Sequence, residues 1–204
     1  MIQVTHGHEF PRLGSPPMMA PFRDVQYVFL DRDGVVNRKA SEGNYIAHWN
    51  EMEILPAAEA AIAALNRSGR KIIVVSNQRG IALGLYTGHD VEALHRQLQN
   101  HLALHGAHID AFYYCPHDEG ECDCRKPGTG MFLQAFRDFP EASPANSIVI
   151  GDSLSDIEAA AALSMRSIFI QGDPLTQKQG AARAAELARF TADSLAAAVQ
   201  QYLV

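Results

Sequence analysis

The chain has 204 residues, of which 47% are hydrophobic and 20% charged, and its formal net charge is -6. This length and composition are typical of one globular domain, and the acidic balance argues against general nucleic-acid binding, which usually needs a basic face. No apolar run approaches the roughly 20 residues of a membrane span, and the N-terminus shows no signal-peptide pattern, so we expect a monomeric cytoplasmic protein that binds neither nucleic acid nor membrane.

The first 24 residues predict a peripheral tail. They hold four prolines and show no helical or alternating pattern. His6 and His8 could bind a metal there, although a plain tail accounts for them as well. We expect residues 25–204 to form a single domain.

Residues 27–30 are apolar and run directly into Asp31-Arg32-Asp33-Gly34. An apolar run that ends at turn residues predicts a strand buried on both faces. Asp31 and Asp33 are two positions apart, so an extended chain points both side chains to the same side. Open α/β sheets bind ligands at the carboxyl ends of their strands. Two neighbouring like charges need compensation, so this pair predicts a metal, a basic residue, or both.

Residues 38–55 are polar and irregular and contain the only tryptophan, Trp49. A connection of this length beside a site could face the substrate. It could equally be a surface connection that Trp49 and Ile54 anchor, and both hypotheses stay open. Pro56 then predicts the start of a helix that runs through residue 65, and Gly69 its end.

A second buried strand is predicted at residues 71–75, which are rich in β-branched side chains and lead into Ser76-Asn77-Gln78. Thr87 with Asp90 predicts the N-cap of a helix that ends near residue 105. Four histidines of this helix are expected on the surface, since no ligand partners lie near them in sequence. They are His89, His95, His101 and His105.

The rest of the chain continues the alternation of strands and helices. We expect a strand at 111–114, a helix at 129–139 that Pro140 stops, a strand at 147–150, a helix at 155–163, a strand at 166–170, a helix at 176–188, and a brief edge element and final helix within 191–203 that Asp193 or Ser194 caps. This alternation predicts a doubly wound α/β fold with a parallel sheet.

Polar clusters follow three of the predicted strands, and the carboxyl ends of parallel strands share one edge of a sheet. The clusters are Asp31/Asp33, Ser76/Asn77/Gln78 and Asp152/Asp156, to which Arg125-Lys126 adds two positive charges. Carboxylates suit magnesium, and arginine and lysine suit phosphate, so the set predicts phosphoryl transfer. Alone, Asp152 could be a helix cap and Ser76-Asn77 a turn. The joint occurrence favours a site.

The three cysteines lie within ten residues of one another, which suits a metal site better than a disulfide framework. Cys115, Cys122 and Cys124 with His117 supply three thiolates and one imidazole, enough for a closed structural zinc site. The spacing is tighter than that of ordinary zinc fingers, so reduced thiols without a metal remain an alternative. A zinc ion would order the loop 115–124 directly before Arg125-Lys126.

Together these motifs resemble the haloacid dehalogenase superfamily, whose four motifs match residues 31–36, Ser76-Asn77-Gln78, Lys126 and residues 151–156. Over about residues 26–173 the chain more closely resembles the D-glycero-D-manno-heptose 1,7-bisphosphate phosphatases. The phosphatase half of bifunctional histidine-biosynthesis enzymes is similar. The closer resemblance is carried by Asn37, by residues 76–82, and by the run from Cys115-Pro116-His117 to Cys124-Arg125-Lys126-Pro127.

The resemblance implies a magnesium-dependent phosphatase that works through an aspartyl phosphate. Asp31 would be the nucleophile, and Asp33 would protonate the leaving oxygen and then deprotonate water. Magnesium would bind Asp31, the backbone carbonyl of Asp33, and Asp152. Asp156 would orient metal-bound water or the lysine without binding the metal directly.

The resemblance also implies that Ser76 and Lys126 bind the transferring phosphoryl group. Further substrate contacts would come from Asn37, Asn77, Gln78 and Arg125. The family lacks a large cap domain, and the stretches 37–56 and 80–87 are too short for one. The implied substrate is a sugar bisphosphate, most simply the heptose 1,7-bisphosphate of surface-polysaccharide precursor synthesis. Histidinol phosphate is the alternative substrate, and a phosphotransferase or a non-catalytic zinc module are the hypotheses from other classes.

Overall fold

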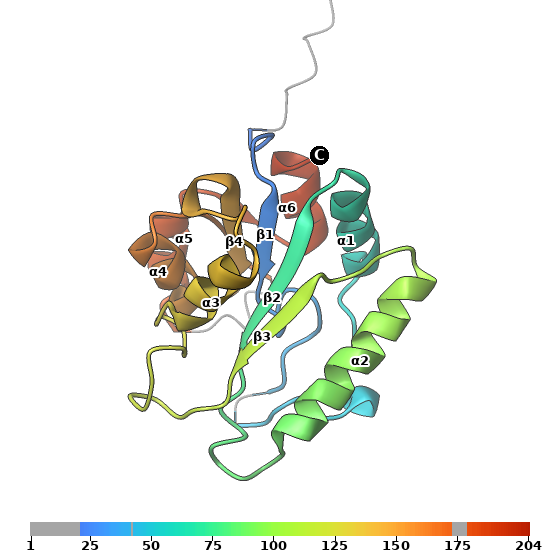
Figure 1. Ribbon diagram of the computed structural model, residues 1–204, viewed down its shortest axis with the longest axis vertical. Helices are drawn as coiled ribbons and strands as arrows, with labels where there is room; N and C mark the ends of the chain where they lie inside the picture. The colour runs from blue at the N-terminus through green and yellow to red at the C-terminus, as the bar shows by residue number, and fades with distance from the viewer. Residues whose placement is uncertain (1–20, 42, 173–178) are drawn as a thin grey trace, which may run out of the picture.

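One parallel sheet organises the described part of the chain, which comprises residues 21–41, 43–172 and 179–204 of a computed structural model (Figure 1). Its strands lie in the order β3-β2-β1-β4-β5-β6, and all neighbours are parallel. Their bounds are β1 (Tyr27–Leu30), β2 (Lys71–Asn77), β3 (Ala111–Cys115), β4 (Ser147–Gly151), β5 (Arg166–Ile170) and β6 (Thr191–Ala192). The strand order reverses between β1 and β4, where sheets of this kind bind ligands.

Helices cover both faces of the sheet, as the doubly wound prediction requires. One face carries α1 (Ala58–Arg67), α2 (Gly88–Leu104) and α6 (Leu195–Tyr202), and the other carries α3 (Gly130–Asp138), α4 (Leu154–Ala162) and α5 (Ala181–Ala188) (Figure 1). Two short 3-10 helices complete the described elements, η1 (Trp49–Glu51) and η2 (Pro144–Asn146). The described connections from β1 to α1 and from β2 to α2 hold no cap domain.

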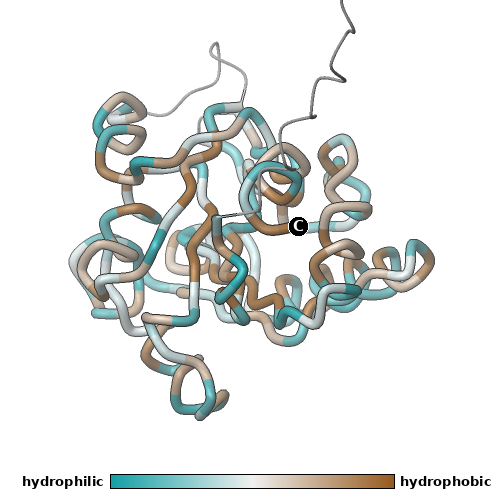
Figure 2. Tube along the Cα trace, turned by 90° about the horizontal axis from the view of Figure 1, so that it is seen from above, coloured by the Kyte–Doolittle hydropathy of each residue, from teal (hydrophilic) through white to brown (hydrophobic). Residues whose placement is uncertain are grey.

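The central strands are apolar throughout because both of their faces are buried. Along β1, Val28 and Leu30 pack with α1 and α6, whereas Phe29 points to the other face and contacts Phe132 of α3. Figure 2 shows hydrophobic residues gathered towards the middle of the molecule. The polar side chains that follow the strands are therefore held on a rigid, well-packed sheet.

The ends of the elements follow the expected chemistry with small shifts. Thr87 caps α2 through a capping box with Asp90, and Ser194, rather than Asp193, caps α6. Helix α1 begins at Ala58 and not at the predicted Pro56, and Gly69 follows it with φ of +82°. Of the helix predicted at 176–188, residues 176–178 lie outside the described residues.

Strand β2 extends two residues beyond its predicted end, to Asn77, because β3 pairs with it over this length. Ser76 and Asn77 therefore lie in a strand and not in a turn. Asn77 is in register with Cys115. The cysteine-containing loop thus begins directly beside the polar end of β2.

The beginning of the described chain packs against the domain. Phe22 is 5% exposed, its N–H donates to the carbonyl of Tyr202, and its ring lies 4.8 Å from that of Phe190. The packed part of the chain therefore includes Phe22, which the sequence assigned to the tail. His6 and His8 lie outside the described residues.

Among the described residues, no helix combines the length and apolarity that a membrane crossing requires.

Candidate active site

Three buried carboxylates gather at the strand ends next to the order reversal. Asp31 follows β1, Asp152 follows β4, and Asp156 lies in the first turn of α4. One carboxylate oxygen from each lies within 4.8 Å of the others. The predicted convergence of motifs far apart in sequence is thus present.

Lys126 compensates part of this negative charge. Its Nζ lies 2.9 Å from Asp31 Oδ1 and 2.5 Å from Asp156 Oδ1, and it also donates to the carbonyl of Val75. Burial lowers the pKa of Lys126, but the charges of Asp156 and Asp31 outweigh burial and raise that pKa overall. The lysine therefore stays charged beside Asp31.

The three carboxylates fit a hard divalent cation, because their ligand atoms are all oxygens. Their negative charge also exceeds the positive charge of the two lysines that contact them, the first of which is Lys126. The second lysine is Lys39, whose Nζ lies 3.1 Å from Asp152 Oδ2. Gly34 permits the close approach of Asp152, since a Cβ at this glycine would lie 2.2 Å from Asp152 Oδ2. Its φ of +102° also favours glycine.

Asp33 lies in a different environment from Asp31. Arg32 Nη2 contacts its two oxygens at 2.9 and 3.1 Å, and the side-chain amides of Asn37 and Gln78 donate to it at 2.9 and 3.2 Å. Burial raises the pKa of Asp33, but the Arg32 charge and the hydrogen bonds from Asn37, Arg32 and Gln78 outweigh burial and lower that pKa overall. The two acids of the motif therefore have separate partners.

The side chains of Asn37 and Gln78 do not reach the cavity wall, contrary to their predicted substrate contacts. Asn37 is 0% and Gln78 2% exposed. Gln78 Nε2 donates to Ser76 Oγ at 2.7 Å, and its oxygen accepts from Tyr86 OH at 2.8 Å. Both residues instead hold Asp33, and Gln78 also holds Ser76.

Asn77 does line the cavity, but both the oxygen and the nitrogen of its side-chain amide bind the backbone of Lys126. Lys126 N–H donates to Asn77 Oδ1 at 2.9 Å, and Asn77 Nδ2 donates to the Lys126 carbonyl at 3.0 Å. This pair of bonds attaches the segment after the cysteines to the end of β2. Asn77 is therefore placed to position Lys126.

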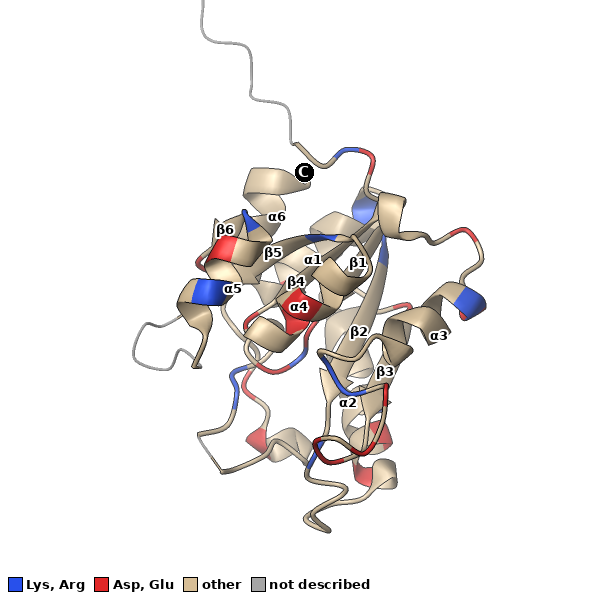
Figure 3. Cartoon of the chain, turned by 90° about the vertical axis from the view of Figure 1, so that its left-hand side faces the viewer, with Lys and Arg blue, Asp and Glu red and all other residues tan. Residues whose placement is uncertain are grey.

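A cavity of about 470 Å³ opens over these residues, and four cations line it. They are Lys39, Arg79, Arg125 and Lys126. Asp31, Asp33, Ser76, Asn77, Ser153, Ser155 and residues 39–41 and 43–46 complete the wall. Figure 3 shows acids and bases close together in the loops at this end of the sheet. The cavity suits a small ligand that carries several negative charges.

One half of the loop 38–55 faces the cavity and the other half packs against the domain, so each of the two hypotheses describes one half. Its first half, through Ile46, lines the cavity. Its second half packs against the domain, where Trp49 lies 5.4 Å from the His101 ring and Ile54 contacts the core. The packed half thus anchors the half that faces the cavity.

Two arginines join the cavity wall to the cysteine-containing loop. Arg79 Nε lies 2.5 Å from Asp118 Oδ1, and Arg125 Nη2 lies 3.4 Å from Glu119 Oε1. A second guanidinium nitrogen of Arg125, Nη1, is buried without a hydrogen-bond partner among the described residues. An anion in the cavity could satisfy it.

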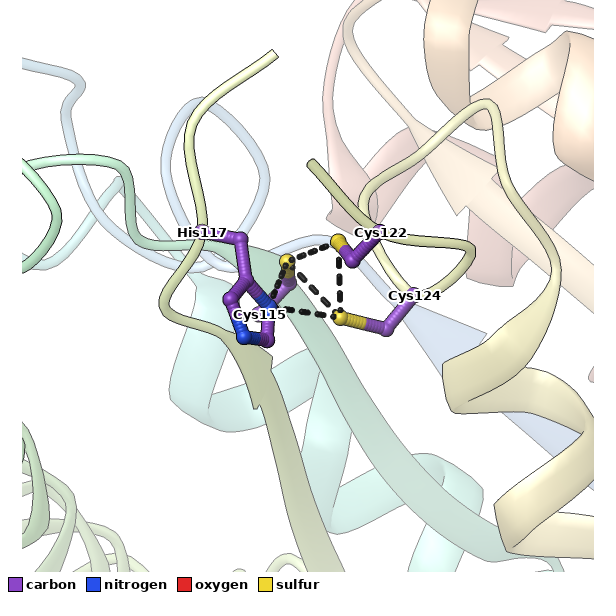
Figure 4. A group of neighbouring side chains, drawn as sticks. All are labelled: Cys115, His117, Cys122 and Cys124. Carbon is purple, nitrogen blue, oxygen red and sulfur yellow. Dashed lines mark hydrogen bonds between the residues drawn. The ribbon is translucent and has the colours of Figure 1, made fainter. Parts of the chain in front are cut away.

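Three thiols and one imidazole from the two ends of this loop converge (Figure 4). Cys124 Sγ lies 2.9 Å from Cys115 Sγ and 3.2 Å from both Cys122 Sγ and His117 Nδ1. Around a zinc ion with bonds of about 2.0–2.3 Å, tetrahedral ligands lie roughly 3.3–3.8 Å apart, so the group fits a closed zinc site. All three cysteines are free of disulfides.

The thiols differ in acidity. Burial raises the pKa of Cys115. Burial also raises the pKa of Cys122, but hydrogen bonds from Cys124 and from the Arg125 backbone outweigh it and bring that pKa to about 7. A thiolate at Cys122 is therefore accessible near neutral pH, which favours metal binding.

His95 is buried, and the expectation of a surface position was wrong. It is 6% exposed, stacks on Phe112 with ring centroids 4.4 Å apart, and lies 3.5 Å from Arg32 Nη1. Helical spacing was the available signal, because His95 follows Val91 by four positions and precedes Leu98 by three. The sequence also gave no role to Arg32, Lys39, Arg79 or Tyr86.

Comparison with known proteins points to one family. A family model described as HAD-hydrolase-like matches residues 123–198. The chain is 45% identical over 151 residues to the D-glycero-alpha-D-manno-heptose-1,7-bisphosphate 7-phosphatase of Mycobacterium bovis, which covers 71% of this chain and 79% of the relative. It is 38% identical over 155 residues to the corresponding beta-heptose enzyme of Rhodopseudomonas palustris, with 72% and 84% covered.

A solved structure has the same fold and a related sequence. The D,D-heptose 1,7-bisphosphate phosphatase of B. bronchiseptica, complexed with magnesium and phosphate, superposes with a TM-score of 0.74 at 30% identity. The superposition covers 87% of this chain and 97% of that protein.

Proposed function

This chain belongs to the family of HAD-like hydrolases that includes the D-glycero-D-manno-heptose-1,7-bisphosphate 7-phosphatases, and we propose that it hydrolyses the 7-phosphate of such a heptose bisphosphate. The observation that carries the proposal is the buried Asp31–Lys126 pair at the floor of a cavity that four cations line. A reacting phosphate at Asp31 leaves Arg79 and Arg125 for a second phosphate.

Asp31 is the proposed nucleophile. Its carboxylate attacks phosphorus, the bond to the C7 oxygen breaks, and an aspartyl phosphate forms. The backbone N–H of Arg32 and the Lys126 ammonium both donate to Asp31 Oδ1, at 2.8 and 2.9 Å. These two donors fix the orientation of the carboxylate, and Lys126 with Ser76 then stabilises the phosphoryl oxygens.

Asp33 is the proposed acid and base. It takes up a proton from the monoanionic substrate phosphate, passes it to the leaving C7 oxygen, and later takes one from the water that hydrolyses the aspartyl phosphate. Arg32, Asn37 and Gln78 hold its carboxylate in place. The amides of Asn37 and Gln78 are thus proposed to act on Asp33, while Arg125 acts on the substrate.

Two metals are proposed. Mg²⁺ would bind Asp31, Asp152 and the backbone carbonyl of Asp33, with Asp156 behind them, and when bound it neutralises charge between carboxylate and phosphate. Zn²⁺ would bind Cys115, His117, Cys122 and Cys124 and order the loop before Arg125. The all-oxygen set and the sulfur-rich set match the two ions by ligand type.

The test is release of inorganic phosphate from both anomers of the heptose 1,7-bisphosphate, from histidinol phosphate and from fructose 1,6-bisphosphate, with and without Mg²⁺. We expect Mg²⁺-dependent release from heptose bisphosphate alone at high kcat/KM, with heptose 1-phosphate as the product by ³¹P NMR. Asp31→Asn should abolish it. Preferred turnover of histidinol phosphate, or activity in Asp31→Asn, would refute the proposal.

The same assay tests the remaining hypotheses. Phosphate release without an acceptor distinguishes a hydrolase from a phosphotransferase, and any turnover excludes a non-catalytic zinc module. The alpha anomer is the favoured substrate, since identity is 45% to the alpha-specific relative and 38% to the beta-specific one. The monomeric state and the cytoplasmic location stay predictions.

A further inference from the structure

A third group of metal-ligating side chains is separate from both proposed metal sites. Glu59 is in the first turn of α1, and His101 and His105 are one turn apart near the end of α2. One ligand atom from each lies within 4.8 Å of the others. The sequence does not indicate that these side chains meet, because Glu59 and His101 are 42 positions apart.

The distances within this group suit a small metal ion. His101 Nε2 lies 3.1 Å from Glu59 Oε1. Two ligands at about 2.0–2.2 Å from a tetrahedral zinc ion lie roughly 3.3 Å apart, so these atoms already have nearly the required separation. His105 is exposed and its ring lies 4.7 Å from the His101 ring, which leaves it room to turn towards a shared ion.

The hydrogen bond of His105 leaves a nitrogen for ligation. Its Nδ1 lies 3.0 Å from the backbone carbonyl of His101. Metal-bound histidines usually donate their other ring N–H to a carbonyl or carboxylate in this way. This hydrogen bond therefore leaves Nε2 of His105 as the nitrogen for a metal.

The carboxylate of Glu59 adds an oxygen donor to the two imidazoles. An ionised carboxylate beside two imidazoles is a ligand set for borderline transition metals, whereas Mg²⁺ and Ca²⁺ prefer oxygen ligands alone.

We propose that Glu59, His101 and His105 form a surface site for a divalent transition-metal ion such as Zn²⁺ or Ni²⁺, which bridges α1 and α2. The site does not depend on the phosphatase reaction. It takes a borderline metal through two nitrogens and one oxygen, and solvent completes the coordination.

Trp49 provides a direct reporter. It is the only tryptophan of the chain, and its ring lies 5.4 Å from that of His101. Ni²⁺, an open-shell ion, quenches indole fluorescence at such short range. The full chain is loaded with Zn²⁺ at the cysteine site, freed of excess metal, and titrated with Ni²⁺ while Trp49 emission is recorded.

We expect saturable quenching in the native chain. The double variant His101→Gln/His105→Gln should weaken binding by at least roughly 10-fold, since even loss of an outer-shell partner typically weakens metal binding 10–100-fold. Glu59→Gln keeps both imidazoles and should weaken it less. The control His89→Gln/His108→Gln removes two other histidines with exposed side chains and should titrate like the native chain.

Thermal unfolding gives a second readout. Ni²⁺ should raise the Tm of the native chain and of the control by more than that of the double variant, because binding to the native state alone stabilises it. Ni²⁺ bound at His6 or His8 would affect every variant equally. Equal quenching and equal Tm shifts in the native chain and the double variant, or no saturation in the native chain, would overturn the proposal.

Discussion

Lys126 Nζ lies 2.9 Å from Asp31 Oδ1, although the two residues are 95 positions apart in the chain. The side chains are 2% and 9% exposed, so solvent screens their attraction only weakly. Asp156 completes the buried group on the other side of the lysine. The nucleophile is therefore held in a charged environment that the fold assembles before substrate binds.

Replacement of Lys126 should affect activity and stability together. In Lys126→Met, Asp31 and Asp156 lose their buried counter-charge, which should lower the free energy of unfolding by about 3–5 kcal/mol without Mg²⁺. The loss of a donor to the phosphoryl oxygens should lower kcat by about 10²-fold or more. Denaturant unfolding and steady-state kinetics measure the two effects. Exposed Arg183→Met serves as the control, and native stability in Lys126→Met would contradict the role of the pair.

Asn77→Ala separates two roles for this amide. If Asn77 positions Lys126 through its two backbone hydrogen bonds, kcat should fall about tenfold while KM changes little. If Asn77 instead contacts substrate, KM should rise at nearly constant kcat. Asn77→Asp keeps the acceptor for the Lys126 N–H and should lose less activity than Asn77→Ala. The measurement is kcat and KM for the heptose bisphosphate.

Loss of a cysteine ligand should unfold the loop before Arg125. Cys122→Ser and Cys124→Ser should each lose the bound zinc, lower Tm and lower activity in parallel, because binding free energy at such a site is folding free energy. Metal content by mass spectrometry, Tm and kcat/KM check this. Glu121→Gln on the same loop should keep its zinc. Full activity in a zinc-free variant would argue that the loop is ordered without metal.

Stability towards acid should depend on His95. Burial, together with the Arg32 charge, lowers the pKa of His95 to about 3. Between about pH 6.5 and pH 3 the unfolded chain therefore binds a proton that the folded chain does not, so stability falls with decreasing pH.

His95→Phe removes this proton. The variant's unfolding free energy should decline less steeply, by up to about 1.4 kcal/mol per pH unit. Urea unfolding between pH 7 and 4 tests the difference, with exposed His108→Gln as the control. Parallel stability curves for His95→Phe and the native chain would show that His95 binds protons normally in the fold.

The order of elements was predictable because local chemistry specifies it. The capping box of Thr87 and Asp90 and the end of α1 before Gly69 both depend on near neighbours in sequence. The apolar runs before Asp31 and Asp152 identified the two central strands, β1 and β4, since such runs are typical of strands buried on both faces. The location of the site could be predicted from these strands, because parallel strands present their carboxyl ends at one edge of the sheet.

The roles of the individual side chains in that region were not predictable, because they depend on contacts between distant segments. The sequence presents Asn37, Asn77, Gln78 and Arg125 as equal candidates for substrate contact. Packing directs Asn37 and Gln78 to Asp33 and Asn77 to the Lys126 backbone, so that Arg125 remains on the cavity wall. His95 is likewise buried only because α2 packs that side against β3.

Sequence reading is sufficient for the strand-end motifs, their order and the ligand types of the two proposed metal sites, since each is a property of a short segment. Which charges meet depends on the packing of distant segments. This packing separates the neighbouring acids, with Asp31 beside Lys126 and Asp33 beside Arg32. The reason is that a side chain's partners depend on how strands and loops pack, so two acids that line one cavity can have different charged partners.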